Sequence, residues 1–199
     1  MKNIRLTVWI GIMCGWLAAG MLQAGTRPDN ARPAEEDGSR LWLPVMRPVE
    51  GAEVEVIYKG KVSPTIAVAI AELKNAWKGE PVLLEKKRTG QGDGFAITSS
   101  EHQVRILSST EAGLLYGVYS LLRMQAAGQV TVPLSVTEQS VYDLRILNHW
   151  DNLDGTVERG YAGCSLWNWE ELPGTLSPRY EAYARANASV GINGTVLNK

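Results

Sequence analysis

Between residues 41 and 140 the spacing of hydrophobic positions switches between a two-residue and a helical repeat, and it predicts the element order β-α-β-β-β-α-β. The first predicted helix starts at Pro64, after an N-cap at Ser63. The second has Thr110 as its cap and Gly128 just beyond its end. Pro133 places the last strand near an edge of the sheet. The predicted strands cover residues 53–59, 82–86, 94–99, 103–108 and 130–137. This order predicts an α+β domain, a small sheet with helices packed on one face.

A second pattern follows in residues 141–199: a strand over residues 145–150, a long polar loop, an amphipathic helix and a strand over residues 193–198. Such a βαβ unit brings both strand ends to one edge, and in (β/α)8 barrels the chemistry lies at that edge. A whole barrel needs roughly 250 residues, so we expect this segment to be the incomplete start of a (β/α)8 TIM barrel that continues beyond Lys199. The residues expected at its active-site mouth are His149, Trp150, Asp151, Asn152 and Asn198.

Residues 1–24 have the layout of an export signal: Lys2 and Arg5, an apolar run over residues 6–22, and a small residue at Ala24. We expect cleavage after Ala24 and a mature protein in the periplasm or outside the cell, with no membrane association. A membrane anchor is the competing interpretation, because an apolar run of about 17 residues reaches the lower end of the spanning range. Residues 25–40 are rich in charge and proline and are predicted to form a linker.

The composition of the chain argues against several classes of function. A net charge of −1 without a dense basic block argues against nucleic acid as a partner. Two histidines and the lack of a Cys-x-x-Cys pair argue against a metal site, and no cofactor is predicted. The glycine-rich residues 89–94 lack the Lys-Ser/Thr pair of a phosphate-binding loop and precede a strand, so a connecting loop is favoured. After signal removal Cys164 is the remaining cysteine, which excludes an intrachain disulfide, and we interpret it as a small apolar residue of the loop.

The loop over residues 151–175 has no clear periodicity, and a loop of about 25 residues inside a compact unit is uncommon unless it has a function. It combines aromatic rings with carboxylates and an arginine. A sugar site requires stacking on the apolar ring face and charged hydrogen bonds to hydroxyls. The alternative is a solvated loop held in place by tryptophan packing. The residues concerned are Asp151, Asp154, Glu158, Arg159, Tyr161, Trp167, Trp169, Glu170 and Glu171.

Several of these runs resemble a known family. LNHWDNLDGTVERGYAG (residues 147–163), then SLWNW and YARANASVGINGTVLN, resemble the start of the catalytic barrel of family 67 glycoside hydrolases, the α-glucuronidases. GLLYGVYSLLRM (residues 113–124) is similar to part of the N-terminal α+β domain of that family. The resemblance covers nearly everything after residue 40. It implies an N-terminal α+β domain over residues 41–140 and a first βαβ unit of the catalytic domain over residues 141–199.

The resemblance implies an exported α-glucuronidase that hydrolyses α-1,2-linked (4-O-methyl)glucuronic acid from xylo-oligosaccharides in xylan degradation, with inversion at the anomeric carbon. Its ligands would be glucuronoxylan-derived oligosaccharides, and a homodimer of the full-length enzyme is an open expectation. Inversion needs a carboxylic acid and a carboxylate about 6.5–9.5 Å apart. In the family these groups lie on later barrel strands. No catalytic residue is therefore assigned within this chain, and the 199-residue fragment is expected to be inactive.

Four residues match the resemblance as substrate-binding candidates. Trp150, at the end of the first strand, would form part of the apolar wall around the glucuronate and its methyl ether. Glu158 and Arg159 would contact hydroxyls and the carboxylate, because a buried sugar acid needs donors and its hydroxyls need acceptors. Asn198 would face the same mouth from the second strand. Structural alternatives remain for each: Trp150 could cap the barrel core, Glu158 and Arg159 could pair with each other, and Asn198 could bond to the backbone.

Two other classes of function stay open. One is a stand-alone secreted carbohydrate-binding or protein-interaction module without catalysis. The other is a structural partner that docks to another chain, which predicts an exposed apolar surface near Ile146, Val190 and Val196.

Overall fold

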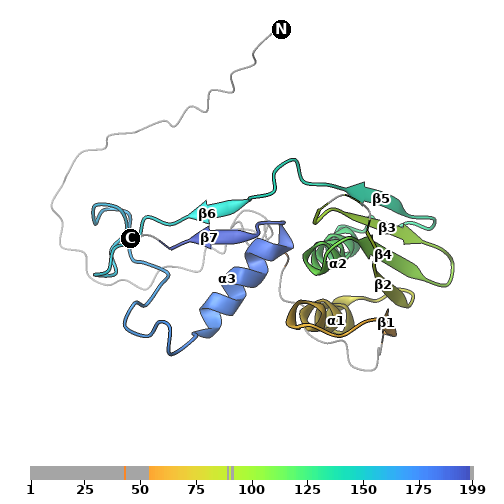
Figure 1. The fold of residues 1–199 in the computed structure, drawn as a ribbon, viewed down its shortest axis with the longest axis horizontal. Coiled ribbons are helices and arrows are strands. Elements are labelled where there is room, and N and C mark those ends of the chain that lie inside the picture. The colour runs from red at the N-terminus through yellow and green to blue at the C-terminus, as the bar shows by residue number, and fades with distance from the viewer. Residues whose placement is uncertain (1–42, 44–53, 89, 91, 198–199) are drawn as a thin grey trace, which may run out of the picture.

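The computed structural model describes Leu43, residues 54–88, Gly90 and residues 92–197. The predicted export signal and linker lie outside the described residues, and so does Asn198. Figure 1 shows the described chain as two parts: a five-stranded sheet with α1 and α2 on one side, and a smaller βαβ unit on the far side of those helices. The predicted α+β domain with helices on one face is therefore confirmed.

The five-stranded sheet has the order β1-β2-β4-β3-β5. The first three strands of this order are parallel, whereas β3 runs antiparallel to both β4 and β5. Side chains alternate between the two faces, so one face of β4 buries Val104, Ile106 and Ser108 against the helices. The strands are β1 (Val56–Tyr58), β2 (Val82–Lys86), β3 (Phe95–Ser99), β4 (Val104–Ser108) and β5 (Ser135–Glu138).

Helix α1 (Pro64–Ala76) begins where its capping signal predicts. The hydroxyl of Ser63 accepts a hydrogen bond from the backbone N–H of Ile66, which satisfies one of the free donors of the first turn. Ile66 and Leu73 are fully buried, and Trp77 follows the helix with 3% of its surface exposed. The indole N–H of Trp77 donates to the carbonyl of Glu80 at 2.8 Å, so this core residue keeps its polar group paired.

Helix α2 (Glu111–Ala126) packs closely on the sheet. Its predicted cap is present, because Thr110 Oγ1 accepts from the backbone N–H of Gly113 at 3.0 Å. Gly117 faces β4 so tightly that a Cβ atom there would lie 2.5 Å from Cγ2 of Ile106. The glycines of this helix therefore permit the close approach of helix and sheet.

The predicted limits of the last sheet strand are wrong. The strand was predicted over residues 130–137, but β5 spans Ser135–Glu138 and the chain reaches it through a cis peptide bond between Val132 and Pro133. Proline has no N–H to donate to a strand ladder, so the pairing starts beyond it. The predicted place of the strand at an edge is confirmed.

The carboxyl-terminal part is a βαβ unit of β6 (Ile146–Asn148), α3 (Pro178–Ser189) and β7 (Gly194–Val196). The strands are parallel, and Leu147 pairs with Thr195. Of the three positions predicted to form an exposed apolar surface, Ile146 and Val196 are 47% and 41% exposed, whereas Val190 is half-buried. Both strands are shorter than the sequence predicted.

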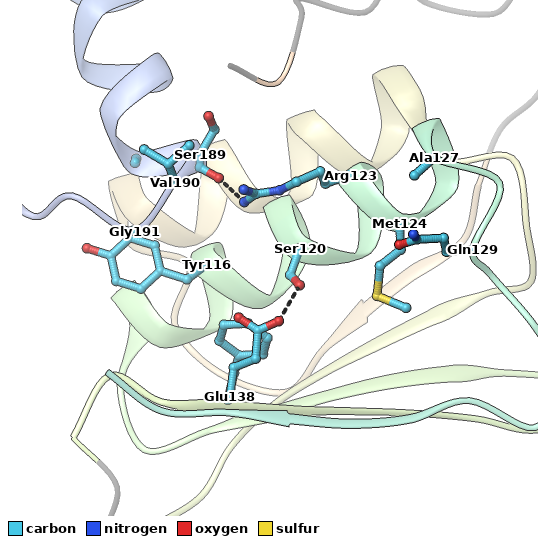
Figure 2. Close-up of a pocket in the computed structure, with 12 residues that line it drawn as sticks. Tyr116, Ser120, Arg123, Met124, Ala127, Gln129, Glu138, Ser189, Val190 and Gly191 are labelled. Atoms are coloured by element: carbon cyan, nitrogen blue, oxygen red, sulfur yellow. Dashed lines mark hydrogen bonds between the residues drawn. The ribbon is translucent and has the colours of Figure 1, made fainter. Parts of the chain in front are cut away.

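Arginine side chains tie the βαβ unit to the α+β domain. Arg123 on α2 donates to the carbonyl of Ser189 at the end of α3, and Arg145 binds Asp93 and the carbonyl of Gly191. Between the two parts lies a hollow of about 380 Å³ lined by residues of α2, β5 and the end of α3 (Figure 2). Both charged side chains drawn there form hydrogen bonds within the protein: Glu138 accepts from the Ser120 hydroxyl, and Arg123 donates to the Ser189 carbonyl. We interpret the hollow as part of the seam between the two parts.

Among the described residues, no helix has both the length and the apolar character needed to cross a lipid bilayer.

Candidate functional site

A cavity of about 470 Å³ lies at the carboxyl end of β6. Its walls come from the strand end and from the loop that follows, which is the edge at which the sequence predicts the mouth of the βαβ unit. Two of the four substrate-binding candidates, Trp150 and Glu158, are among its lining residues. The full lining is Asn148, His149, Trp150, Asp151, Val157, Glu158, Cys164 and Leu166.

Trp150 presents its ring to solvent at this cavity, with 58% of its surface exposed. This exposure shows that Trp150 is not part of a core within the described residues, and the alternative role as a cap of the barrel core stays a prediction. An exposed indole beside a cavity provides an apolar face on which a sugar ring can stack. The backbone carbonyl of Trp150 also accepts from the N–H of Glu158 at 2.7 Å, which brings the loop back to the strand end.

His149 and Asp151 form the base of the cavity. Asp151 is 2% exposed, and its Oδ2 lies 3.3 Å from Nδ1 of His149. The other ring nitrogen of His149 lies 2.5 Å from the hydroxyl of Tyr183 on α3, and this hydroxyl is 3.3 Å from Oγ1 of Thr195 on β7. This series of contacts joins the residues after β6 to α3 and β7. Asp151 is thus a buried carboxylate that supports this framework through its contact with His149.

Aromatic rings support the histidine from the side. Trp167 is 8% exposed and makes an edge contact with His149, with ring centroids 5.5 Å apart. It stacks on Tyr180 at 5.0 Å and meets Tyr183 edge-on at 5.4 Å. The indole N–H of Trp167 is buried and has no hydrogen-bond partner among the described residues. The long loop is therefore fastened to α3 by tryptophan packing, as one of the two sequence interpretations predicted.

The turn after the strand is held by Asn152, Asp154 and Thr156. The Asn152 side chain donates to Thr156 Oγ1 at 2.9 Å, and this hydroxyl donates to Asp154 Oδ1 at 2.7 Å. The backbone N–H of Thr156 donates to the same carboxylate oxygen at 2.9 Å. These hydrogen bonds lower the pKa of Asp154 below its usual value, because they favour the ionised form. Asp154 is thus an exposed, ionised carboxylate that stabilises the turn.

Glu158 has a backbone φ of 57°, and it is the one residue other than glycine with a positive φ in the described part of the chain. A side chain in this left-handed region costs on the order of 1–3 kcal/mol, and such strain persists where the surroundings impose it. The carbonyl of Glu158 accepts from Nδ2 of Asn152 at 2.6 Å. Its carboxylate interacts with the hydroxyl of Tyr161, and this hydrogen bond raises the pKa of Tyr161. A strained carboxylate residue at a cavity is typical of a functional site.

The other two candidates differ in placement. Arg159 is exposed and is not part of the cavity lining. Asn198 lies outside the described residues, so its predicted role stays a prediction. Cys164 lines the cavity but is exposed, which places it in the loop as predicted while leaving its thiol accessible to solvent.

Among the described residues, no group of three or more His, Cys, Asp or Glu side chains is arranged to hold a metal ion. The arrangement at the cavity instead offers an exposed aromatic face, a carboxylate acceptor and an accessible polar rim. These features suit recognition of a hydroxylated ring.

Sequence reasoning missed two supporting residues of this site, both on α3. Tyr183 and Tyr180 are three residues apart on α3 and so lie on one face, a spacing that predicts a shared target. Trp167 was predicted only as a member of the loop. The hydrogen bonds of Asn152 carry no sequence signal beyond its place at a strand end.

Comparison with known proteins bears on this part of the chain. Residues 124–199 match the glycosyl hydrolase family 67 middle domain. The resemblance to family 67 is confirmed. All the residues that line the cavity lie within the matched range. The match begins inside α2 and includes the whole βαβ unit.

Curated relatives agree with the family match. "Probable alpha-glucuronidase A" is 39% identical over 107 residues in Aspergillus clavatus and 42% identical over 107 residues in Neosartorya fischeri. "Alpha-glucuronidase A" of Aspergillus tubingensis is 38% identical over 106 residues. Each match covers 53% of this chain and 12% of the relative, so the chain is similar to a small part of these glycosidases.

A solved GH138 enzyme targeting pectin rhamnogalacturonan II superposes with a TM-score of 0.42 at 16% sequence identity. This superposition covers 54% of the present chain and 19% of that enzyme.

Proposed function

We propose that this chain is part of an exported family 67 α-glucuronidase that hydrolyses α-1,2-linked (4-O-methyl)glucuronic acid from glucuronoxylan-derived oligosaccharides. The observation that carries the proposal is the cavity at the end of β6, where Trp150 and Glu158 meet inside the range that matches the family. The names of the curated relatives support the glucuronidase activity. The parallel βαβ unit is the first step of a (β/α)8 barrel in this proposal.

Within the site, Trp150 provides the apolar wall against one face of the sugar, and the Glu158 carboxylate accepts hydrogen bonds from its hydroxyls. Arg159 and Asn198 supply contacts from the rim. The acid and base of the inverting reaction lie outside these 199 residues, so the chain alone binds sugar without hydrolysing it.

Binding is measured through Cys164, because its thiol is exposed and lines the same cavity. A Cys14→Ser background leaves it as the reporter thiol. Glucuronate is expected to slow alkylation of Cys164, whereas glucose at equal concentration slows it less because it lacks the carboxylate. Equal protection by both sugars, or none by either, would contradict the proposed site.

Hydrolysis is measured separately with aldouronic acids. The 199-residue chain is expected to release no glucuronate above a heat-killed control. Reproducible release would show that the catalytic groups are within the chain and would overturn their placement elsewhere.

A further inference from the structure

The backbone of Glu158 is held in an unfavourable conformation by hydrogen bonds on both sides of the residue. Its N–H donates to Trp150 at 2.7 Å, and its C=O accepts from Asn152 Nδ2 at 2.6 Å. The left-handed region is disfavoured for residues with a Cβ atom, and glutamate lacks the short polar side chain that relieves this cost in Asn or Asp. The surroundings must therefore impose the conformation.

Asn152 is built to impose it. The side-chain amide of Asn152 donates one hydrogen to the Glu158 carbonyl and the other to Thr156 Oγ1. The Thr156 hydroxyl in turn donates its own hydrogen to Asp154. Because a carbonyl only accepts, the nitrogen of the amide must face Glu158.

The main chain of Asn152 is fixed as well. Its N–H donates to the carbonyl of Thr156 at 2.8 Å, and its carbonyl accepts from the indole N–H of Trp169 at 3.0 Å. The amide that grips Glu158 is thus anchored to the turn on one side and to the far end of the loop on the other.

We propose that Asn152 is a positioning residue for the sugar site: its amide clamps the carbonyl of Glu158 in the left-handed conformation and so keeps the Glu158 carboxylate at the cavity beside Trp150. The effect of Asn152 on the Glu158 backbone does not depend on any ligand. Its consequence for the ligand rests on the proposed function.

The clamp is tested without ligand by a double-mutant cycle. Asn152→Asp keeps the size of the side chain but replaces the donor with oxygens that repel the Glu158 carbonyl. Glu158→Gly removes the strain, because glycine adopts positive φ readily. Hydrogen exchange is followed in a peptide spanning residues 150–165. In the chain that keeps Glu158, Asn152→Asp should speed exchange by about tenfold, because it removes one half-buried hydrogen bond to a strained residue.

In the Glu158→Gly background the same substitution should speed exchange by less than about threefold, because the glycine stays left-handed unaided. Equal acceleration in both backgrounds would overturn the clamp. Asn168→Asp is the matched control from the same loop. Its Oδ1 accepts from the N–H of Glu170 at 3.2 Å, and an aspartate keeps that acceptor, so exchange should remain at the wild-type rate.

The ligand consequence is tested by glucuronate protection of Cys164. Protection should be lost in Asn152→Asp and kept in Asn168→Asp. If the exchange cycle shows the expected coupling but glucuronate still protects Cys164 fully in Asn152→Asp, the role of Asn152 in binding is overturned and only its structural role remains. Absence of protection in the wild-type chain would overturn the proposed function, while the exchange cycle would still decide the clamp.

Discussion

Arg185 on α3 grips both carboxylate oxygens of Glu72 on α1, with Nε 2.6 Å from Oε1 and Nη2 2.9 Å from Oε2. The two side chains are 17% and 14% exposed, so water screens the pair only partly. Arg185 also donates to the carbonyl of Leu43 at 2.8 Å and lies over the ring of Tyr119. This pair fastens the βαβ unit to the α+β domain.

Substitution Arg185→Met should therefore destabilise the chain strongly. It leaves the Glu72 carboxylate, whose side chain is 14% exposed, beside the Tyr119 hydroxyl without its cation. Removing one partner of a fully buried pair costs about 3–5 kcal/mol, and the partial exposure of this pair places the expected cost near the lower end of that range. Urea unfolding would measure the loss. The double variant Glu72→Leu with Arg185→Met should recover much of it. Lys86→Met, at the exposed Lys86–Glu111 pair, is the control, and a loss no larger than that of the control would contradict the prediction.

Gly117→Ala should destabilise the protein even though alanine favours helices. The intrinsic gain of about 1 kcal/mol is outweighed because the new methyl group would lie 2.5 Å from Ile106 Cγ2, inside the core. Thermal unfolding should show a lower Tm. Gly174→Ala is a suitable comparison, since the nearest atom to its added Cβ is 3.6 Å away. A rise in Tm for Gly117→Ala would show that α2 can move off the sheet at little cost.

The elements of the α+β domain could be predicted because their signals are local. Ser63 and Thr110 act as caps through contacts three residues away, and the alternation of β4 is visible in the sequence. The limits of β5 could not be predicted, because they depend on where pairing resumes after Pro133.

The site was predictable only in outline. Trp150 was predicted at the mouth because active sites of (β/α)8 barrels lie at the carboxyl ends of the strands. Glu158 was predicted because it belongs to a loop rich in aromatic and charged residues. The left-handed backbone of Glu158 and the amide of Asn152 arise from loop closure, which has no periodic signature. The Arg185–Glu72 pair joins residues 113 positions apart, a separation at which single-sequence patterns carry no information.

Trp150 and Trp167 should respond in opposite ways to removal of the ring. Trp150→Ala removes an exposed indole, so stability should change little while glucuronate protection of Cys164 is lost. Trp167→Ala removes a buried ring that contacts His149, Tyr180 and Tyr183, and such a truncation costs about 3–5 kcal/mol. Urea unfolding and Cys164 alkylation on both variants make the comparison. Strong destabilisation by Trp150→Ala would mean that this ring serves packing instead of ligand binding.

The turn at Asp154 should contribute stability that acid removes. Hydrogen bonds from the Thr156 hydroxyl and backbone N–H lower the pKa of Asp154 in the folded chain. A carboxyl group whose folded pKa is lowered stabilises the fold above its unfolded pKa of about 3.9, and this contribution disappears as pH falls through the folded pKa. The unfolding free energy of the wild type minus that of Asp154→Asn should therefore be constant at neutral pH and shrink below about pH 4. Thr156→Val removes the hydroxyl that donates to Asp154. The difference in unfolding free energy caused by Asp154→Asn should therefore be smaller when it is measured in the Thr156→Val chain. A difference that grows in acid would mean that Asp154 binds its proton more tightly in the folded chain, the opposite of what its hydrogen bonds require.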